Sequence, residues 1–464
     1  IVVEMKLSFY GGAGKVTGSN FLIEGSRGKI LVDCGIEQGA DFVEEHNYGA
    51  FHYDVKSIDA LVLTHAHLDH VGRIPKLVRD GFRGKIYMTP PTKDLAELIM
   101  LDSVGILSEE ARHRGVAPLY EVQDVKKTFA QIETLDYHVE KEIAPGLSVY
   151  LRNTGHILGS ASVRIKDEDG TAVALTGDIG NLPSPLLPDW EPITDADVLV
   201  MESVYGDRLH PPHSERISRL RETLRRAVAR GGTILIPAFS LERTQLMLYE
   251  LSNFFSAKEL PKIPVFLDSP LAIRVTDVYE KCGPTYFKTE VEDEIKREGS
   301  IFEFPFLKQT LSRNDSEDIE GTKGPKIIIA GAGMSHGGRI GKWEARYLPD
   351  PSSTLIIVGY QAPGSPGRRM MEGAANVRLN GAEIQIKAKI ENLHGWSAHA
   401  DRDGLLKFAE ASLPRAKTIF TAIGEPSAER FLAQRIHDYL GATAIVPDLG
   451  QTWEITKDSA KLTN

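Results

Sequence analysis

One short segment of the chain concentrates side chains that bind metal ions. His65, His67, Asp69 and His70 lie in the sequence Thr-His-Ala-His-Leu-Asp-His, directly after the apolar run Ala60–Leu63. Imidazole and carboxylate are ligand types that suit zinc. Because His65 and His67 are two residues apart, an extended turn can present both to one ion. Asp69 and His70 are offset and can hold a second ion. Four such side chains in one turn after a buried strand favour a metal site over a solvated loop.

Three further candidates lie at the ends of other apolar runs. Asp33 follows Ile30–Val32, His156 lies in Gly-His-Ile-Leu-Gly-Ser, and Asp178 lies in Thr-Gly-Asp-Ile-Gly. Each has an ordinary interpretation when taken alone, because a single loop histidine is usually solvated and a Gly-Asp pair usually makes a turn. Together with the histidine turn they complete a dinuclear set. His156 would complete the first ion, and the Asp178 carboxylate could bridge both.

Short strands and amphipathic helices alternate along the whole chain and would position these residues. Apolar runs predict strands at 1–10, 29–33, 60–64, 85–88, 147–152, 162–166, 171–176 and 198–202, and helical spacing predicts a helix over 92–111. A charged helix is expected over 213–230, followed by apolar runs at 233–237, 264–268, 326–330 and 354–359 that helices separate. Parallel strands with crossover helices are the simplest interpretation. The charged stretch 290–324 is expected to be a surface excursion. The end returns to strand, helix and strand at 418–422, 425–440 and 443–446. Two α/β units are therefore expected, the second inserted into the first.

Length and composition narrow the class of protein. A chain of 464 residues with 42% hydrophobic and 25% charged residues predicts a globular protein of two domains, without a membrane-spanning segment. The net charge of −10 argues against broad, non-specific coating of nucleic acid, but it is compatible with a local basic groove. Two distant cysteines, Cys34 and Cys282, favour a reducing, cytoplasmic setting. No secretory signal is expected before Tyr10, although the absent initiator methionine leaves a removed leader open.

The order of these motifs resembles that of the metallo-β-lactamase superfamily, from Asp33 through the histidine turn to Asp178. Three later blocks resemble one branch of it, the β-CASP nucleases, which include the endonuclease of messenger RNA 3′-end processing and related bacterial and archaeal ribonucleases. The blocks are Glu-Ser-Val-Tyr-Gly at 202–206, Gly-Tyr-Gln-Ala-Pro-Gly at 359–364 and Trp-Ser-Ala-His-Ala-Asp at 396–401. The resemblance implies an α/β protein with an αββα metallo-β-lactamase sandwich and an inserted β-CASP domain, a parallel sheet flanked by helices. The expected domains are 1–207, 208–390 and 391–464, the first and last forming the sandwich.

The resemblance also implies roles for the candidate residues. The first zinc ion would take His65, His67, His156 and Asp178, and the second Asp69, His70 and Asp178. Asp69 is placed among the catalytic residues as well, and Asp33 would orient a ligand histidine. His399 would protonate the leaving oxygen or donate to the scissile phosphate, and Glu202 would hold His399 protonated. The alternative for His399 is a role in opening the helix that follows, but Asp401 already supplies a good N-cap.

One position departs from the family pattern. The family carries a further histidine ligand in a Val-His-Gly-Glu type block, where this chain has Ala422-Ile423-Gly424-Glu425. Isoleucine cannot bind metal, so the second zinc site is expected to be weakened. Two alternatives remain: His394 could act as a substitute ligand, or the chain could be an altered nuclease that mainly binds RNA.

The sequence therefore predicts a zinc-dependent ribonuclease that acts by a two-metal mechanism on single-stranded RNA, as an endonuclease, with 5′-to-3′ exonuclease action left open. The candidates for RNA contact are weaker, because surface arginines are usually solvated and glycine-rich turns are common. They are Arg243, Arg339, Arg368 and Arg369, and the loop Gly331–Gly338 with Ser335 and Gly338. The alternatives are a catalytically weak RNA-binding subunit and a hydrolase of DNA or another phosphodiester; β-lactam, thioester or lactone hydrolysis is disfavoured. A homodimer is left open.

Overall fold

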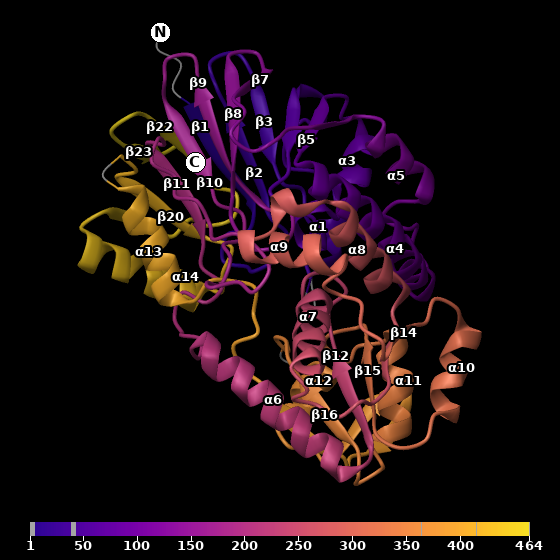
Figure 1. Ribbon diagram of the computed structural model, residues 1–464. Coiled ribbons are helices and arrows are strands. Elements are labelled where there is room, and N and C mark those ends of the chain that lie inside the picture. Colours follow the sequence, from indigo (N-terminus) through magenta and orange to yellow (C-terminus); the bar gives the residue numbers. More distant parts are fainter. Residues whose placement is uncertain (1–4, 39–42, 363, 414, 464) are drawn as a thin grey trace. The chain divides into compact units, whose positions relative to one another are not determined.

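The computed structural model describes residues 5–38, 43–362, 364–413 and 415–463. The chain divides into two compact units (Figure 1). Unit 1 joins the N-terminal part, up to Leu209, with the C-terminal part from His399 onward, and unit 2 comprises His210–Ala398.

Unit 1 contains an eight-stranded sheet in the order β23-β22-β1-β2-β3-β4-β5-β6. Strands β3 to β6 run parallel, whereas β23, β22, β1, β2 and β3 pair antiparallel. The strands are β1 (Met5–Gly11), β2 (Asn20–Glu24), β3 (Lys29–Val32), β4 (Ala60–Val62), β5 (Lys85–Met88), β6 (Ile132–Thr134), β22 (Thr452–Ile455) and β23 (Ala460–Leu462).

A second sheet of unit 1 has seven strands in the order β21-β20-β11-β10-β9-β8-β7. Its strands are β7 (Lys141–Ala144), β8 (Leu147–Asn153), β9 (Ala161–Asp167), β10 (Ala172–Leu175), β11 (Val198–Glu202), β20 (Thr418–Ala422) and β21 (Thr443–Ile445). One core cluster draws side chains from both sheets, including Phe9 and Phe21 from the first and Val163 and Phe420 from the second. The two sheets therefore pack face to face.

Helices cover the outer faces of this sandwich. On the second sheet, Leu405 and Phe408 of α13 and Leu432 of α14 pack against Leu199 and Met201 of β11. The helices of unit 1 are α1 (Val43–Tyr48), a 3-10 turn (Val55–Ser57), α2 (Leu68–Val71), α3 (Ile74–Asp80), α4 (Pro90–Arg114), α5 (Val122–Phe129), α13 (Arg402–Ser412) and α14 (Pro426–Arg435), which continues as a π-helical turn (Ile436–Leu440). Figure 1 shows α3, α4 and α5 beside the β5 end of the first sheet. This is the αββα sandwich that was predicted.

Unit 2 is built on a six-stranded, entirely parallel sheet in the order β14-β13-β15-β12-β16-β19. Its strands are β12 (Thr233–Pro237), β13 (Val265–Leu267), β14 (Leu307–Gln309), β15 (Lys326–Ala330), β16 (Thr354–Ile357) and β19 (Lys389–Asn392), with a separate hairpin of β17 (Asn376–Leu379) and β18 (Ala382–Gln385). Its helices are α6 (His213–Arg230), α7 (Arg243–Ser256), α8 (Pro270–Lys281), a 3-10 turn (Pro284–Tyr286), α9 (Thr289–Glu298), α10 (Arg313–Gly321), α11 (Gly338–Tyr347) and α12 (Pro366–Met371). The predicted parallel strands with crossover helices are confirmed.

The surface excursion expected at 290–324 is wrong in part. That stretch forms α9 and α10, and between them β14 pairs in parallel with β13 at the edge of the sheet. The three residues of β14 are half-buried or exposed, so they leave no apolar run that would reveal a strand. Among the described residues, no helix combines the length and the apolar character needed to cross a membrane.

Candidate metal centre

The candidate ligands of unit 1 gather at the carboxyl ends of parallel strands. Asp33 follows β3 and His65 follows β4, which pair in parallel in the first sheet. Asp178 follows β10 and Glu202 ends β11, which pair in parallel in the second sheet. Because parallel strands end at the same edge, both sheets of the sandwich present their polar residues there.

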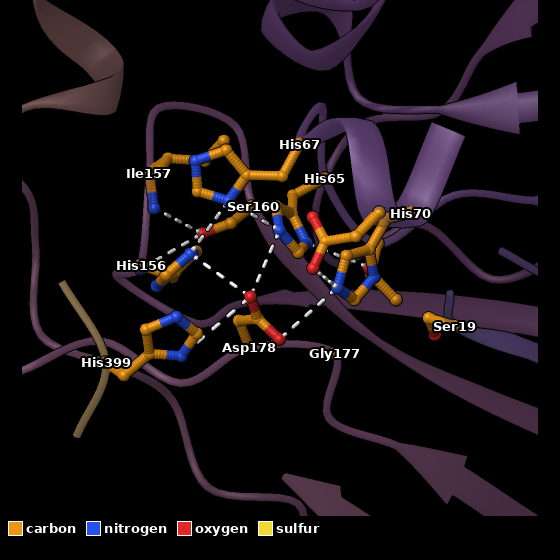
Figure 2. A network of polar contacts seen from close by, with 12 residues as sticks. Ser19, His65, His67, His70, His156, Ile157, Ser160, Gly177, Asp178 and His399 are labelled. Atoms are coloured by element: carbon orange, nitrogen blue, oxygen red, sulfur yellow. Dashed lines mark hydrogen bonds and ion pairs between the residues drawn. The ribbon is translucent and has the colours of Figure 1, made fainter. Parts of the chain in front are cut away.

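Four donor atoms form one compact group (Figure 2). The His67 Nδ1 atom lies 3.1 Å from His65 Nε2 and 3.2 Å from His156 Nε2, and Asp178 Oδ2 lies 3.3 Å from each of those two Nε2 atoms. A tetrahedral zinc site with bonds of about 2.0–2.1 Å has ligand atoms roughly 3.3–3.4 Å apart, since the edge of a tetrahedron is about 1.63 times the distance from its centre to a corner. The group therefore has the composition and nearly the dimensions of a tetrahedral zinc site.

Hydrogen bonds set the tautomers of two of the histidines. Thr64 donates its hydroxyl hydrogen to Asp33 Oδ2 at 2.9 Å, so that hydroxyl can only accept from His65 Nδ1, 3.0 Å away. His70 Nδ1 lies 2.7 Å from the same Asp33 oxygen. In both rings Nδ1 therefore carries a proton, which leaves Nε2 as the atom that can bind a metal ion. Burial alone would lower the pKa of His70, but the nearby carboxylates, Asp178 first, raise it well above its usual value, so a metal ion at His70 has to displace a proton.

Burial favours the neutral form of the first three ligands. It lowers the pKa of His65 and holds the pKa values of His67 and His156 well below the usual value. A metal ligand must be the neutral imidazole, so these histidines are ready to bind without losing a proton.

A second group of donors is smaller. His70 Nε2 lies 3.4 Å from Asp178 Oδ1 and 3.9 Å from Asp69 Oδ2. Within the described part of the chain, His70 Nε2 and Asp178 Oδ1 are buried and have no hydrogen-bond partner. Two buried polar atoms in that state indicate that a further group, such as a second cation, belongs between them.

Ile423 occupies an unusual backbone conformation directly after β20. Its φ angle is +49°, a left-handed conformation that a β-branched residue rarely adopts. Its N–H donates to the Gly12 carbonyl at 2.5 Å, and its carbonyl accepts from Ser203 N. The side chain is buried in the core cluster between the sheets. The backbone here is thus held in a conformation that suits histidine better than isoleucine.

His399 and Glu202 form a pair beside the first group. Glu202 is fully buried, and its carboxylate oxygens lie 3.2 and 3.3 Å from His399 Nδ1. The Ile179 N–H donates to Glu202 at 2.5 Å, which fixes the carboxylate, and Ile179 O accepts from Ala400 N, which fixes the histidine loop. Burial alone would lower the pKa of His399, but the carboxylates of Glu202 and Asp178 outweigh it and raise that pKa to about 9.

Asp401 is the N-cap of α13, with its carboxylate accepting from Gly404 N at 3.0 Å. His399 therefore has no capping role to fill, as was predicted.

Three family models match successive parts of the chain. The metallo-beta-lactamase superfamily matches residues 13–238, the Beta-Casp domain matches 244–370, and the Zn-dependent metallo-hydrolase RNA specificity domain matches 383–447. The chain is 35% identical to Ribonuclease TTHA0252 of Thermus thermophilus, over 88% of this chain and 91% of that protein.

The chain belongs to the β-CASP branch of the metallo-β-lactamase superfamily. It is also 32% identical to Transcription termination factor FttA of Pyrococcus horikoshii, over 96% of this chain and 70% of that protein. A crystal structure of a protein of unknown function from Enterococcus faecalis V583 superposes with a TM-score of 0.55 at 13% identity, over 97% of this chain and 99% of that one, which supports the fold alone. The β-CASP family implies bound metal ions, and the donor atoms described above fit them.

The residues suggested for RNA contact all lie in unit 2 of this β-CASP chain, and several make contacts within it. Arg339 donates to the buried Asp268 at 2.5 Å and to the carbonyls of Thr310 and Leu311. Arg368 donates to Glu372, the C-cap residue of α12, at 2.6 Å. The contacts of Arg339 favour a structural role, because they join the residue after β13 to the segment before α10. Arg368 remains on the surface.

The loop Gly331–Gly338 makes contacts within itself and with α11. Ser335 is buried with a φ of +58° and donates to Glu344 at 2.5 Å. At Gly338 (φ +67°) a Cβ would lie 2.4 Å from the Gly331 carbonyl oxygen, so only glycine fits. Arg243, the first residue of α7, is buried, and the exposed His394 lies 3.1 Å from the side chain of Asn392.

Two residues that position ligands were not singled out from the sequence. Thr64 joins Asp33 to the first histidine, and Ser160 accepts from His156 N at 3.1 Å and from Ile157 N at 3.3 Å. Both are hydroxyl residues inside the quoted motifs, at the start of the histidine turn and at the end of the His156 loop. That placement is the only signal that could have indicated them.

Proposed function

We propose that the chain is a zinc-dependent ribonuclease that hydrolyses phosphodiester bonds of single-stranded RNA. The observation that carries the proposal is the group of His65, His67, His156 and Asp178, whose donor atoms are spaced as in a tetrahedral zinc site. The names of the relatives and the RNA specificity domain supply the substrate class. Unit 2 would be the β-CASP domain, inserted into the sandwich that unit 1 forms.

Metal ions held by these residues would polarise the phosphodiester and supply hydroxide at neutral pH. His399 would protonate the leaving oxygen, which leaves a 3′-hydroxyl on one product and a 5′-phosphate on the other. Glu202 keeps that proton in place: its buried carboxylate stabilises the imidazolium, and its bond from Ile179 N keeps it from turning away. Asp33 orients His70 by accepting its Nδ1–H. The Thr64 hydroxyl orients His65 by accepting its Nδ1–H while it donates to Asp33.

The second ion would be held by Asp69, His70 and Asp178, and we propose that it binds more weakly than the first. The family histidine that would complete this site is Ile423 here. An isoleucine buried in the apolar core offers no donor atom, so water would have to fill the vacancy.

A second candidate function follows from the same residue. A chain with an incomplete second site could be a catalytically weak subunit that mainly binds RNA. The complete first group and the Glu202–His399 pair favour the enzyme. The proposal includes endonuclease action, with 5′-to-3′ exonuclease action as a second mode, a preference for RNA over DNA and a cytoplasmic location.

The test is cleavage of 5′-labelled single-stranded RNA and matched DNA by zinc-supplemented protein. The control is the double variant His65→Ala/His67→Ala, which lacks half of the first ligand set. RNA cleavage that the control lacks supports the nuclease, and the sizes of the products over time separate endonuclease from exonuclease action. RNA binding without cleavage of either polymer would instead support the binding subunit.

A further inference from the structure

Charge is distributed unequally between the two units. Unit 2 carries 26 Lys and Arg against 23 Asp and Glu, a net charge of +3, whereas the rest of the chain carries 28 against 41, a net charge of −13. The overall charge of −10 therefore conceals one unit that is mildly basic. Because field strength depends on local charge, unit 2 is the part of the chain to search for a surface that binds a polyanion.

Helix α6 holds the densest run of positive charge in unit 2. Its 18 residues include six arginines, two glutamates and no lysine. Figure 1 shows α6 running along one flank of unit 2. Leu220, Leu224 and Ala227 lie on its buried face, and exposed arginines lie along the border of that face.

Three of these arginines form a stripe, Arg219, Arg226 and Arg230, which we call the arginine stripe. Spacings of seven and four residues return to the same face of a helix. The rise of an α-helix places their Cα atoms about 10 Å and about 6 Å apart. Arg219 is 46% exposed and Arg226 is 59% exposed, and Arg230 is also exposed.

Asp350 interacts electrostatically with Arg230, but the acids beside the other two arginines do not close onto them. The carboxylate of Glu215 stays 3.6 Å from Arg219, and that of Glu391 stays 3.8 Å from Arg226. By contrast, Arg221, which lies off the stripe, closes onto Glu259 at 2.8 Å. Contacts of 3.6–3.8 Å between exposed side chains are weak and screened by salt, so Arg219 and Arg226 stay available to an anion.

Strand β19 adds a fourth cation to this surface. Glu391 reaches Arg226 from β19, and Lys389, two residues earlier, points to the same face of that strand and is exposed. The Arg230 guanidinium donates to the Pro351 carbonyl, and Lys389 N donates to Ser353 O, so both residues border the segment 351–353. The cations thus extend from the helix across the edge of the sheet.

We propose that the arginine stripe, together with Lys389, binds the sugar-phosphate backbone of RNA. The planar guanidinium donates two parallel hydrogen bonds to one phosphate, a geometry that lysine lacks. A row of cations along a helix follows a backbone without reading its bases. This inference rests on the proposed ribonuclease function for the identity of the polyanion, and it assigns to the RNA a binding surface made of residues other than those of the metal centre.

The test compares two triple variants of the full chain. Arg219→Gln/Arg226→Gln/Arg230→Gln removes the stripe and keeps residues that favour a helix. The matched control, Lys258→Gln/Lys281→Gln/Lys323→Gln, removes three exposed charges elsewhere in unit 2. Fluorescence anisotropy with a labelled single-stranded RNA gives the dissociation constant over a range of salt concentrations. Hydrolysis of bis(p-nitrophenyl) phosphate, which is too small to span a helix, reports on the metal centre separately.

Loss of three phosphate contacts should reduce the slope of log K against log salt by about 2, because each contact to a single strand contributes about 0.7. If the affinities converge near 1 M salt, the same slope predicts roughly 100-fold weaker binding near 0.1 M. The control should keep both the slope and the dissociation constant within about twofold of the original protein, as its charges are not in register with a backbone. Hydrolysis of the small diester should be unchanged in both variants.

Equal RNA binding by the stripe variant and the original protein would overturn the proposal, and so would an equal loss in the control. A third variant, with lysine at the same three positions, guards against misfolding: it should keep the salt slope and lose only part of the affinity. Failure of the original protein to hydrolyse any diester would contradict the proposed function, while the binding data would still decide the role of α6.

Discussion

Restoring the family histidine at position 423 should strengthen the second metal site. In Ile423→His, the new imidazole would add a fourth donor to Asp69, His70 and Asp178. A gain of at least tenfold in the affinity for the second zinc ion is expected, which corresponds to about 1.4 kcal/mol. The original protein, after dialysis, should retain close to one zinc ion per chain and the variant close to two.

The change in stability without metal can be estimated from the same position. The Ile423 side chain is 3% exposed, and its burial contributes about 2–3 kcal/mol that a histidine would largely lose. The left-handed backbone costs roughly 1–2 kcal/mol for a residue with a branched Cβ, and histidine tolerates that region better. The metal-free variant should therefore unfold with a free energy lower by only about 1 kcal/mol.

The assays are metal analysis after dialysis, zinc titration by calorimetry and chemical denaturation with and without a chelator. Ile423→Asn is the matched control, because asparagine also accepts the left-handed conformation but supplies no imidazole. If Ile423→His raises neither zinc affinity nor activity, position 423 does not face the second ion and its assignment is wrong. Two tightly held zinc ions in the original protein would contradict the weak second site.

Three further predictions concern single carboxylates. The pKa of His399 is raised to about 9, so its acid form is lost as pH rises through that value. Glu202→Gln should therefore shift the alkaline limb of the kcat/KM profile to lower pH. The loss of kcat/KM should be on the order of tenfold near pH 8 and much less near pH 6. An unchanged alkaline limb would show that Glu202 does not keep His399 protonated. Burial raises the pKa of Glu344 from 4.5 to about 8, so the folded state holds an extra proton and the unfolding free energy falls as pH rises from about 4.5 to about 8. Glu344→Gln should remove a few kcal/mol of that fall, seen by denaturation near pH 5 and pH 8.5 beside the exposed control Glu317→Gln; an unaltered pH slope would contradict it. Asp33→Asn should weaken zinc binding by about 10–100-fold in a chelator competition, and an unchanged affinity would refute the orienting role.

The sequence predicted the elements that carry strong local signals. Val198–Glu202 and Lys326–Ala330 are buried at every residue and apolar except for one charged residue at an end, so their bounds agree with the predicted ones. β14 could not be predicted, because three partly exposed residues carry no periodicity and pair only through the rest of the sheet. β19 pairs in parallel with β16 in the sheet of unit 2, and this unit extends to Ala398.

The ligand set of the site could be predicted from the sequence because its residues are close in sequence or follow strands. Their orientation was not, because it depends on contacts between distant segments. The Thr64 hydroxyl and Asp33 fix two tautomers across 31 residues, and Glu202 reaches His399 across 197. The same limit applies to Arg339, whose pairing with a buried Asp268 required the fold of unit 2.

Zinc-dependent RNA cleavage, measured on protein that is stripped of metal and then reloaded, is the decisive test of the proposed metal centre. Protein freed of metal by a chelator would be titrated with zinc while cleavage of a 5′-labelled single-stranded RNA is followed, beside the His65→Ala/His67→Ala variant. We expect no cleavage before zinc is added, a rise in rate with added zinc, and no cleavage at any zinc concentration by the variant. Cleavage by the stripped protein, or equal cleavage by the variant, would contradict a metal centre at His65, His67, His156 and Asp178.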